Sequence, residues 1–298
     1  IKMEEKILRN GKTLFICNIT DFEDTIAFKI FASEDDAPVY KDELKEGSFY
    51  RLKGVPLYDT FSKELNIASV RGIKHIPDFR VPRVDTSLEK RVELHMHTVM
   101  SEMDSVVDIE KIVKRANDWG HPAIAITDHG VMYGVINFYR AARAEGINPI
   151  LGCEVYVAPG SRFDREKSSG DDRYYHLVLL AENNKGYSNL MKIVSKGYTE
   201  GYYYKPRVDR SVLEEYHEGI IALSACLAGE VQKYLTRGLY EEAKKAALEH
   251  EQIFGKGNYF LELQDHGIPE QKMVNQQLLR MSKETGIELV ATNDVHYT

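Results

Sequence analysis

The chain has 298 residues, of which 43% are hydrophobic and 29% charged, as in an ordinary globular protein. Its net charge of −7 argues against a surface that coats DNA broadly, so any nucleic-acid contact must be local. No apolar run approaches the roughly 20 residues that span a bilayer and no signal peptide starts the chain, so we expect a cytoplasmic protein without membrane contact.

Residues 1–76 read as short strands joined by polar turns. After a first short strand, we predict strands over 13–19, 25–31, 49–56 and 65–76, with a short helix over 41–46. Three strands, a helix and two strands are the order of a small all-β OB-like barrel, and a generic β-module is the alternative. We place Phe15, Phe28 and Tyr50 in the core of this module rather than on a base-stacking surface.

Residues 77–89 contain two prolines and no periodicity, so we predict a linker there and a second domain over 90–298. In this domain, strands alternate with amphipathic helices over 109–119, 133–145, 186–196, 240–253 and 270–285. The seven predicted strands cover 91–98, 123–128, 149–157, 175–181, 219–225, 258–264 and 287–295. The pattern predicts an α/β fold with a parallel sheet, and seven repeats favour a (βα)7 barrel with its chemistry at the carboxyl ends of the strands.

Metal-ligand residue types recur at these strand ends. The candidates are His95, His97, Asp104, His129, Glu154, His176, Cys226, Asp294 and His296. Nine ligands exceed the needs of one tetrahedral zinc and suit two or three divalent ions. The mixture of imidazole, carboxylate and thiolate favours zinc, with manganese or iron as alternatives, over a pure magnesium site. Such a cluster activates water and clamps phosphate oxygens, which indicates phosphoester hydrolysis.

Individual candidates have plainer explanations. His129 could be a capping or core histidine, and Cys226 a small buried hydrophobe. His176 lies at the start of its predicted strand, so its spacing places it least firmly. His266 follows the sixth strand and could line the site or serve the structure. Coincidence at six of seven strand ends is much less expected than any single case.

The motifs His95-Met96-His97, Thr127-Asp128-His129, Gly152-Cys153-Glu154 and Asn293-Asp294-Val295-His296 resemble those of the PHP (polymerase and histidinol phosphatase) family. The resemblance extends over residues 90–298 and is greatest to the PHP domains of bacterial DNA polymerase III α subunits. It implies a distorted seven-stranded barrel with up to three metals on the nine residues named above. Catalytic roles then fall to His97, Asp104 and Glu154, the two carboxylates being candidates for bridging.

Two types of α subunit are represented. Residues 1–110 resemble the PolC type, and the chain from about Ile147 resembles the DnaE type without the inserted exonuclease domain of PolC, since the connection from Ala158 to Arg173 is short. The chain starts without Met and both ends look like cuts in a longer polypeptide, so we expect a fragment that lacks the polymerase core.

The resemblance implies a 3′–5′ exonuclease that proofreads the single-stranded 3′ end of DNA, with the rest of the polymerase chain and replisome subunits as partners. Two loops combine cations with aromatics and could hold DNA through Arg162, Arg165, Tyr204, Lys205 and Arg207. A non-catalytic, metal-stabilised docking module is the main alternative. A small-molecule phosphatase is a third, which the OB-like module disfavours.

Overall fold

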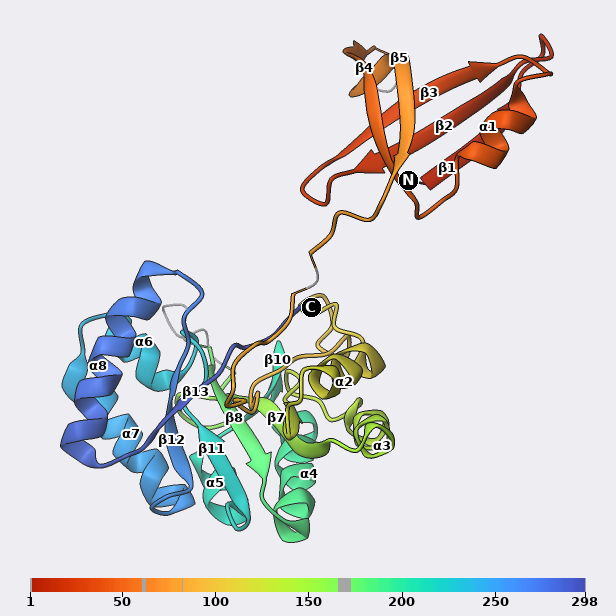
Figure 1. The fold of residues 1–298 in the computed structure, drawn as a ribbon. Helices are drawn as coiled ribbons and strands as arrows, with labels where there is room; N and C mark the ends of the chain where they lie inside the picture. Colours follow the sequence, from red (N-terminus) through yellow and green to blue (C-terminus); the bar gives the residue numbers. More distant parts are fainter. Residues whose placement is uncertain (1, 61–62, 82, 166–172, 298) are drawn as a thin grey trace. The chain divides into compact units, whose positions relative to one another are not determined.

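The computed structural model describes residues 2–60, 63–81, 83–165 and 173–297 (Figure 1). The chain divides into two compact units, Ile1–Arg83 and Val84–Thr298, and the cut falls inside the predicted linker 77–89. Part of the predicted short connection between Ala158 and Arg173 lies outside the described residues. No described helix is both long and apolar enough to cross a membrane.

The first unit is one five-stranded sheet with a short helix. Its elements are β1 (Lys2–Ile7), β2 (Thr13–Thr20), β3 (Thr25–Ala32), α1 (Ala37–Glu43), β4 (Phe49–Asp59) and β5 (Glu64–Ile76), and the strand order is β1-β2-β3-β5-β4. The predicted core residues Phe15, Phe28 and Tyr50 are all buried. The helix starts earlier than the predicted 41–46, because Pro38 in its first turn has a backbone φ already suited to a helix.

The strand and helix order is the one that the OB-like prediction requires. β4 tolerates Pro56 because it lies at an edge of the sheet, where a missing N–H breaks no ladder. Gly54 is required at a bulge in the same strand, since a Cβ there would lie 2.3 Å from the Ile67 side chain. The OB-like identity of this unit stays a prediction.

The second unit is a mixed sheet covered by helices. The strands are β6 (Ala123–Ile126), β7 (Asn148–Val157), β8 (Tyr175–Ala181), β9 (Tyr202–Tyr203), β10 (Lys205–Val208), β11 (Ile220–Leu223), β12 (Tyr259–Leu263) and β13 (Leu289–Ala291). The helices are α2 (Ile109–Asp118), α3 (Val135–Glu145), α4 (Asn184–Thr199), α5 (Arg210–Tyr216), α6 (Glu230–Thr236), α7 (Tyr240–Phe254) and α8 (Pro269–Thr285). Helices α2 and α3 pack in one core cluster, whereas the buried residues of α4, α5, α6, α7 and α8 share another; Figure 1 shows the helices around the strands.

All five predicted helices of this unit are present, and the strands β9 and β10 and the short helices α5 and α6 were not predicted. The predicted N-cap Asp108 accepts a hydrogen bond from the backbone N–H of Lys111, and α3 ends at Gly146 with a φ of 80°. The missed helices have only seven residues each, too few to show a helical repeat in the sequence.

The prediction of a wholly parallel sheet is wrong. β8 pairs antiparallel with both β7 and β11, whereas β6 with β7, β11 with β12 and β12 with β13 are parallel. No helix lies between β7 and β8 among the residues described there, so the chain returns beside itself as in a hairpin. The reversal puts the start of β8 beside the carboxyl ends of its neighbours.

The predicted strand over 91–98 is not a regular strand. Its ladder contacts are isolated bridges, Glu93 to Ile124 and Met96 to Val295, which link it to β6 and to the segment after β13. The backbone N–H groups of Met96 and Thr98 donate to the side chains of Thr127 and Asp128 instead of to a strand partner. Backbone hydrogen bonds from Ala125 and Thr127 to this segment and between His97 and Val295 hold it as well, so side chains supplement an incomplete ladder.

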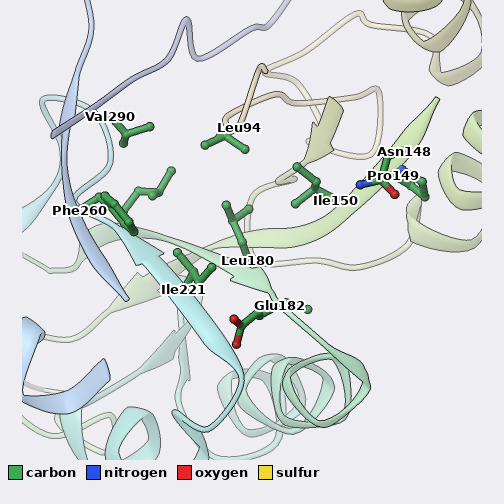
Figure 2. A pocket seen from close by; sticks show the side chains of 11 residues that line it. Leu94, Asn148, Pro149, Ile150, Leu180, Glu182, Ile221, Phe260 and Val290 are labelled. Atoms are coloured by element: carbon green, nitrogen blue, oxygen red, sulfur yellow. The ribbon is translucent and has the colours of Figure 1, made fainter. Parts of the chain in front are cut away.

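An apolar pocket of about 470 Å³ lies at the end of the sheet away from these bridging side chains. Figure 2 shows the side chains around it, and the large apolar ones include Leu94, Ile150, Leu180, Ile221, Phe260 and Val290. They come from the segment before Met96 and from β7, β8, β11, β12 and β13. The exposed carboxylate of Glu182 lines the same pocket.

Candidate metal centre

All nine predicted ligands come together at one end of the second unit. The parallel strands deliver them at or beyond their carboxyl ends: His129 follows β6, Cys226 follows β11, and Asp294 and His296 follow β13. His176 lies at the start of β8, and the antiparallel direction of that strand explains why a strand start contributes to this group. The sequence could not reveal this direction.

Glu154 is the centre of the cluster. Its carboxylate is 1% exposed, and four imidazoles lie within 3.4 Å of it. Oε2 lies 3.4 Å from Nε2 of His95, 3.2 Å from Nε2 of His97 and 2.8 Å from Nδ1 of His129. Oε1 lies 3.1 Å from Nδ1 of His176. A carboxylate whose two oxygens face different imidazoles is placed to bridge two cations.

Two further carboxylates complete the polar layer. Asp294 Oδ1 lies 3.2 Å from Nε2 of His95 and 3.3 Å from Nε2 of His97. Asp104 Oδ2 lies 2.7 Å from Nε2 of His129 and 3.6 Å from Nε2 of His296. The groups His95–His97–Glu154, His129–Glu154–His176 and His97–His129–His296 each gather their ligand atoms within 4.8 Å.

Cys226 joins the cluster more loosely, with its Sγ 3.8 Å from Nδ1 of His176. Burial, together with the nearby Glu154 and Asp294 carboxylates, raises the pKa of this thiol well above its usual value. A thiolate at this position therefore needs a cation beside it.

Several polar atoms that face the middle of the cluster are buried and make no hydrogen bond of acceptable geometry, although short distances separate them. Among the described residues they include Nε2 of His95, Nε2 of His97, Nδ1 of His129, Oε2 of Glu154 and Oδ1 of Asp294. Buried polar groups without partners are rare because each is costly. Atoms of these types, all facing the same space, fit divalent cations.

The outer hydrogen bonds select the imidazole tautomers that such cations need. Nδ1 of His95 lies 2.7 Å from the buried carboxylate of Glu262, so its proton stays on that side. Nδ1 of His97 lies 3.0 Å from Oγ of Ser101, whose hydroxyl donates to Asp128 and therefore accepts from the ring. Both Nε2 atoms are thus left as free lone pairs that face the cluster.

The carboxylates of the cluster attract positive charge to the imidazoles, which either a proton or a divalent cation can supply. Burial would lower the pKa of His95, but the carboxylates of Glu262, Asp294 and Glu154 outweigh it and hold that pKa well above its usual value. Burial would raise the pKa of Glu154, yet His176, His95 and His129 hold it well below its usual value. The carboxylates thus stay ionised and create a strong local demand for positive charge.

Three non-glycine residues at this end have left-handed backbones, which cost free energy and gather at functional sites. They are Met103 (φ 61°), Ala225 (φ 65°) and Asp294 (φ 47°). Met103 precedes the candidate ligand Asp104 and Ala225 precedes Cys226. Backbone strain therefore accompanies three of the nine positions.

Sequence reasoning missed the outer layer of Glu262, Ser101 and Asp128. Glu262 is a lone carboxylate inside the apolar strand β12, the one predicted strand to which no ligand was assigned, and this was the available sequence signal. His266 serves the structure, since its Nε2 lies 2.7 Å from the carbonyl oxygen of Asn293 and its Nδ1 contacts Gln271.

A cleft of about 560 Å³ opens beside the centre and shares Asp104, His129 and His176 with it. Six tyrosines line this cleft: Tyr133, Tyr156, Tyr174, Tyr198, Tyr202 and Tyr204. Met103 and Lys205 line it as well. We refer to these eight residues as the tyrosine cleft.

The five predicted DNA contacts separate into two groups. Tyr204 and Lys205 are exposed in the tyrosine cleft, and the exposed Arg165 donates to the carbonyl oxygen of Tyr202. Arg207 is 4% exposed and donates to the carbonyl oxygen of Asp164, while Arg162 forms ion pairs with Glu200 and Asp209. The guanidinium groups of Arg162 and Arg207 thus hold the loops together, and the contact of these loops with DNA stays a prediction.

Comparison with known proteins places the site in a family context. A family model described as PHP domain matches residues 93–266. The chain is 48% identical over 206 residues to DNA polymerase III subunit alpha of Treponema pallidum, covering 69% of this chain and 18% of that protein. It is 45% identical over 216 residues to the same subunit of Deinococcus radiodurans, covering 70% and 16% respectively.

The chain thus spans less than a fifth of the length of these curated relatives. Among solved structures, it is similar to an amidohydrolase from Chromobacterium violaceum, with a TM-score of 0.46 and 14% identity. That similarity covers 69% of this chain and 87% of the other.

Proposed function

The chain belongs to the PHP domain family, and on this premise we propose that its centre is a metal-dependent phosphodiesterase acting as a 3′–5′ exonuclease on single-stranded DNA. The observation that carries the proposal is the set of buried polar atoms without partners around Glu154. The tyrosine cleft beside them supplies a place for the strand.

The centre suits two or three divalent ions, with zinc as the first choice and manganese or iron as alternatives. His95, His97, Asp104, His129, Glu154, His176, Cys226, Asp294 and His296 would hold them. When bound, such ions lower the pKa of water and polarise a phosphate oxygen.

The chain's own residues have distinct tasks in this proposal. Glu154 and Asp104 are the candidates to bridge, since Glu154 faces four imidazoles and Asp104 faces His129 and His296. Glu262 and Ser101 fix the protons of His95 and His97 on the outer side.

The identity of the matched relatives supports a wider context. We propose that the domain works within a DNA polymerase III α subunit in the cytoplasm and removes misincorporated nucleotides, with the polymerase chain and replisome subunits as partners. The same proposal includes the division into three parts, 1–76, 77–89 and 90–298. It also takes the first part to be OB-like and the last to be a closed seven-stranded barrel. The bridges of Glu93 and Met96 support the closure.

The test uses the purified full chain, its bound metal counted, with a 3′-labelled single-stranded oligonucleotide and separately a generic phosphomonoester. We expect shortening from the 3′ end that a chelator stops and His97→Ala abolishes. Turnover of the phosphomonoester alone would favour a small-molecule phosphatase.

The competing function is a metal-stabilised docking module that hydrolyses nothing. The extensive hydrogen-bond network around the centre favours it as much as it favours catalysis, because rigid metal sites also stabilise folds. If the fully metal-loaded protein turns over neither substrate, the result supports the docking module and contradicts the exonuclease.

A further inference from the structure

The tyrosine cleft presents an unusual amount of aromatic surface to solvent. Tyr133, Tyr202 and Tyr204 are 66%, 51% and 60% exposed, and Met103 is fully exposed. They come from three separate parts of the chain: the loop before Asp104, the loop before α3, and the β9–β10 segment. Exposed apolar side chains that gather beside a polar centre mark a binding surface.

Cations lie on the rings of this region. Nζ of Lys205 is 5.3 Å from the ring centre of Tyr156, and Cζ of Arg173 is 4.8 Å from that of Tyr204. In such a surface the rings can stack on the bases of a nucleic-acid strand, and the cations can contact its phosphates. The whole chain has a net charge of −7 and therefore little general affinity for nucleic acid, so binding would depend on these few local contacts.

Met103 differs from the tyrosines in kind. It stands next to the candidate ligand Asp104 on a left-handed backbone, with its whole side chain in solvent. Exposed methionines of this sort act in other proteins as apolar wedges between stacked base pairs. Its place between the centre and the cleft puts such a wedge where a strand end would arrive.

We propose that the tyrosine cleft determines which ends the centre can act on: it stacks the unpaired terminal bases of a strand on Tyr202 and Tyr204, and Met103 excludes an end that is still base-paired. This inference rests on the proposed function, which supplies the reaction but not the selection. In a duplex only the outer face of the terminal pair is uncovered, so only an unpaired strand can place successive bases on both rings.

Binding tests the cleft without any reaction. The full chain is titrated into a labelled single strand with phosphorothioate linkages at its 3′ end, and into the same strand annealed flush to its complement, with anisotropy as the readout. We expect tighter binding of the single strand. Tyr204→Leu and, separately, Tyr202→Leu weaken that binding by about 5- to 100-fold each, the range for one lost stacking contact.

Tyr139→Leu is the matched control, because Tyr139 is 45% exposed on α3 and does not line the cleft. Met103→Ala is expected to narrow the difference between single strand and duplex by raising duplex binding. The same variants are then compared for hydrolysis of the unmodified single strand relative to bis(p-nitrophenyl) phosphate, a diester without bases. Tyr204→Leu lowers this ratio, chiefly through KM.

The outcomes separate the two proposals. Equal binding of single strand and duplex, or tyrosine variants that bind like Tyr139→Leu, overturns the cleft as the selecting element even if the diester is hydrolysed. Weakened single-strand binding in a metal-loaded protein that hydrolyses nothing supports the cleft and overturns the exonuclease.

Discussion

The two ends of the sheet in the second unit are built from the same strands and have opposite chemistry. Leu94 lines the apolar pocket, and the next residue, His95, faces the metal centre. β7 carries Ile150 to one end and Glu154 to the other, and β8 does the same with Leu180 and His176. Figure 2 shows the apolar end.

The comparison shows at which end of the sheet burial stabilises the fold and at which end it destabilises the fold. At the apolar end burial itself is stabilising, at roughly 25 cal/mol for each Å² removed from water. At the polar end burial is costly, because ionised carboxylates and unpaired imidazole nitrogens lie away from solvent. Burial therefore stabilises one end directly, whereas the other end would gain stability from bound cations.

Replacing Glu154 should break the polar end most severely. Glu154→Gln removes the charge that faces four imidazoles, and we expect loss of bound metal and a fall in DNA hydrolysis of at least about a hundredfold, since even outer partners of metal ligands cost 10–100-fold. Metal analysis and a labelled-oligonucleotide assay measure both. Glu182→Gln, at the exposed carboxylate of the apolar end, is the control and should change neither.

Removing the metal should destabilise the second unit, because the polar end of its sheet would lose its cations. For ions present at a thousand times their Kd, the free energy of unfolding falls by about 4 kcal/mol on chelation. Thermal unfolding followed by circular dichroism, with and without chelator, gives the shift in Tm. An unchanged Tm in protein shown to have lost its metal contradicts the need for cations.

At the apolar end, truncation should affect stability but not metal. Leu180 is 4% exposed, and Leu180→Ala should lower the free energy of unfolding by about 2–3 kcal/mol, the low side of the usual range because a pocket already adjoins it. Urea unfolding measures the loss. Reduced metal content in this variant would show that the two ends are coupled.

The outer layer offers a finer test of the polar end. Glu262→Gln keeps the shape but weakens the hold on the His95 proton, and we expect about 10- to 100-fold weaker metal binding, measured by competition with a chelator. Glu284→Gln, on the exposed side of α8, is its control. Equal affinity in both variants would leave Glu262 a purely structural role.

Features that depend on local sequence could be predicted, and features that depend on contacts between distant segments could not. Most of the nine candidate ligands could be found because they stand at or near the ends of short apolar runs, which is a local pattern. The direction of β8, the carboxylate of Glu262 behind His95 and the burial of Arg207 depend on contacts between distant segments. Arg207 next to three tyrosines looked like a DNA contact, and only the fold shows its guanidinium bound to backbone carbonyls.

A second buried ionic group away from the centre sharpens the comparison, because this one brings its own counter-charges. Oε1 of Glu230 lies 3.0 Å from Nη2 of Arg210, and Oε2 lies 3.1 Å from Nε2 of His250. Burial would raise the pKa of Glu230, but His250 and Arg210 outweigh it and lower that pKa below its usual value of 4.5.

Glu230→Gln should therefore cost about 1.5 kcal/mol of stability near pH 7, the worth of a hydrogen bond to a charged group. A carboxylate with a lowered folded-state pKa stabilises above its unfolded value, and this contribution is lost as the pH falls through the folded value. The difference between wild type and Glu230→Gln should thus be constant above about pH 5 and shrink below pH 4.5, as urea unfolding across pH would measure. Chelator should leave that difference unchanged, since Glu230 meets its charge with protein groups and the metal centre does not.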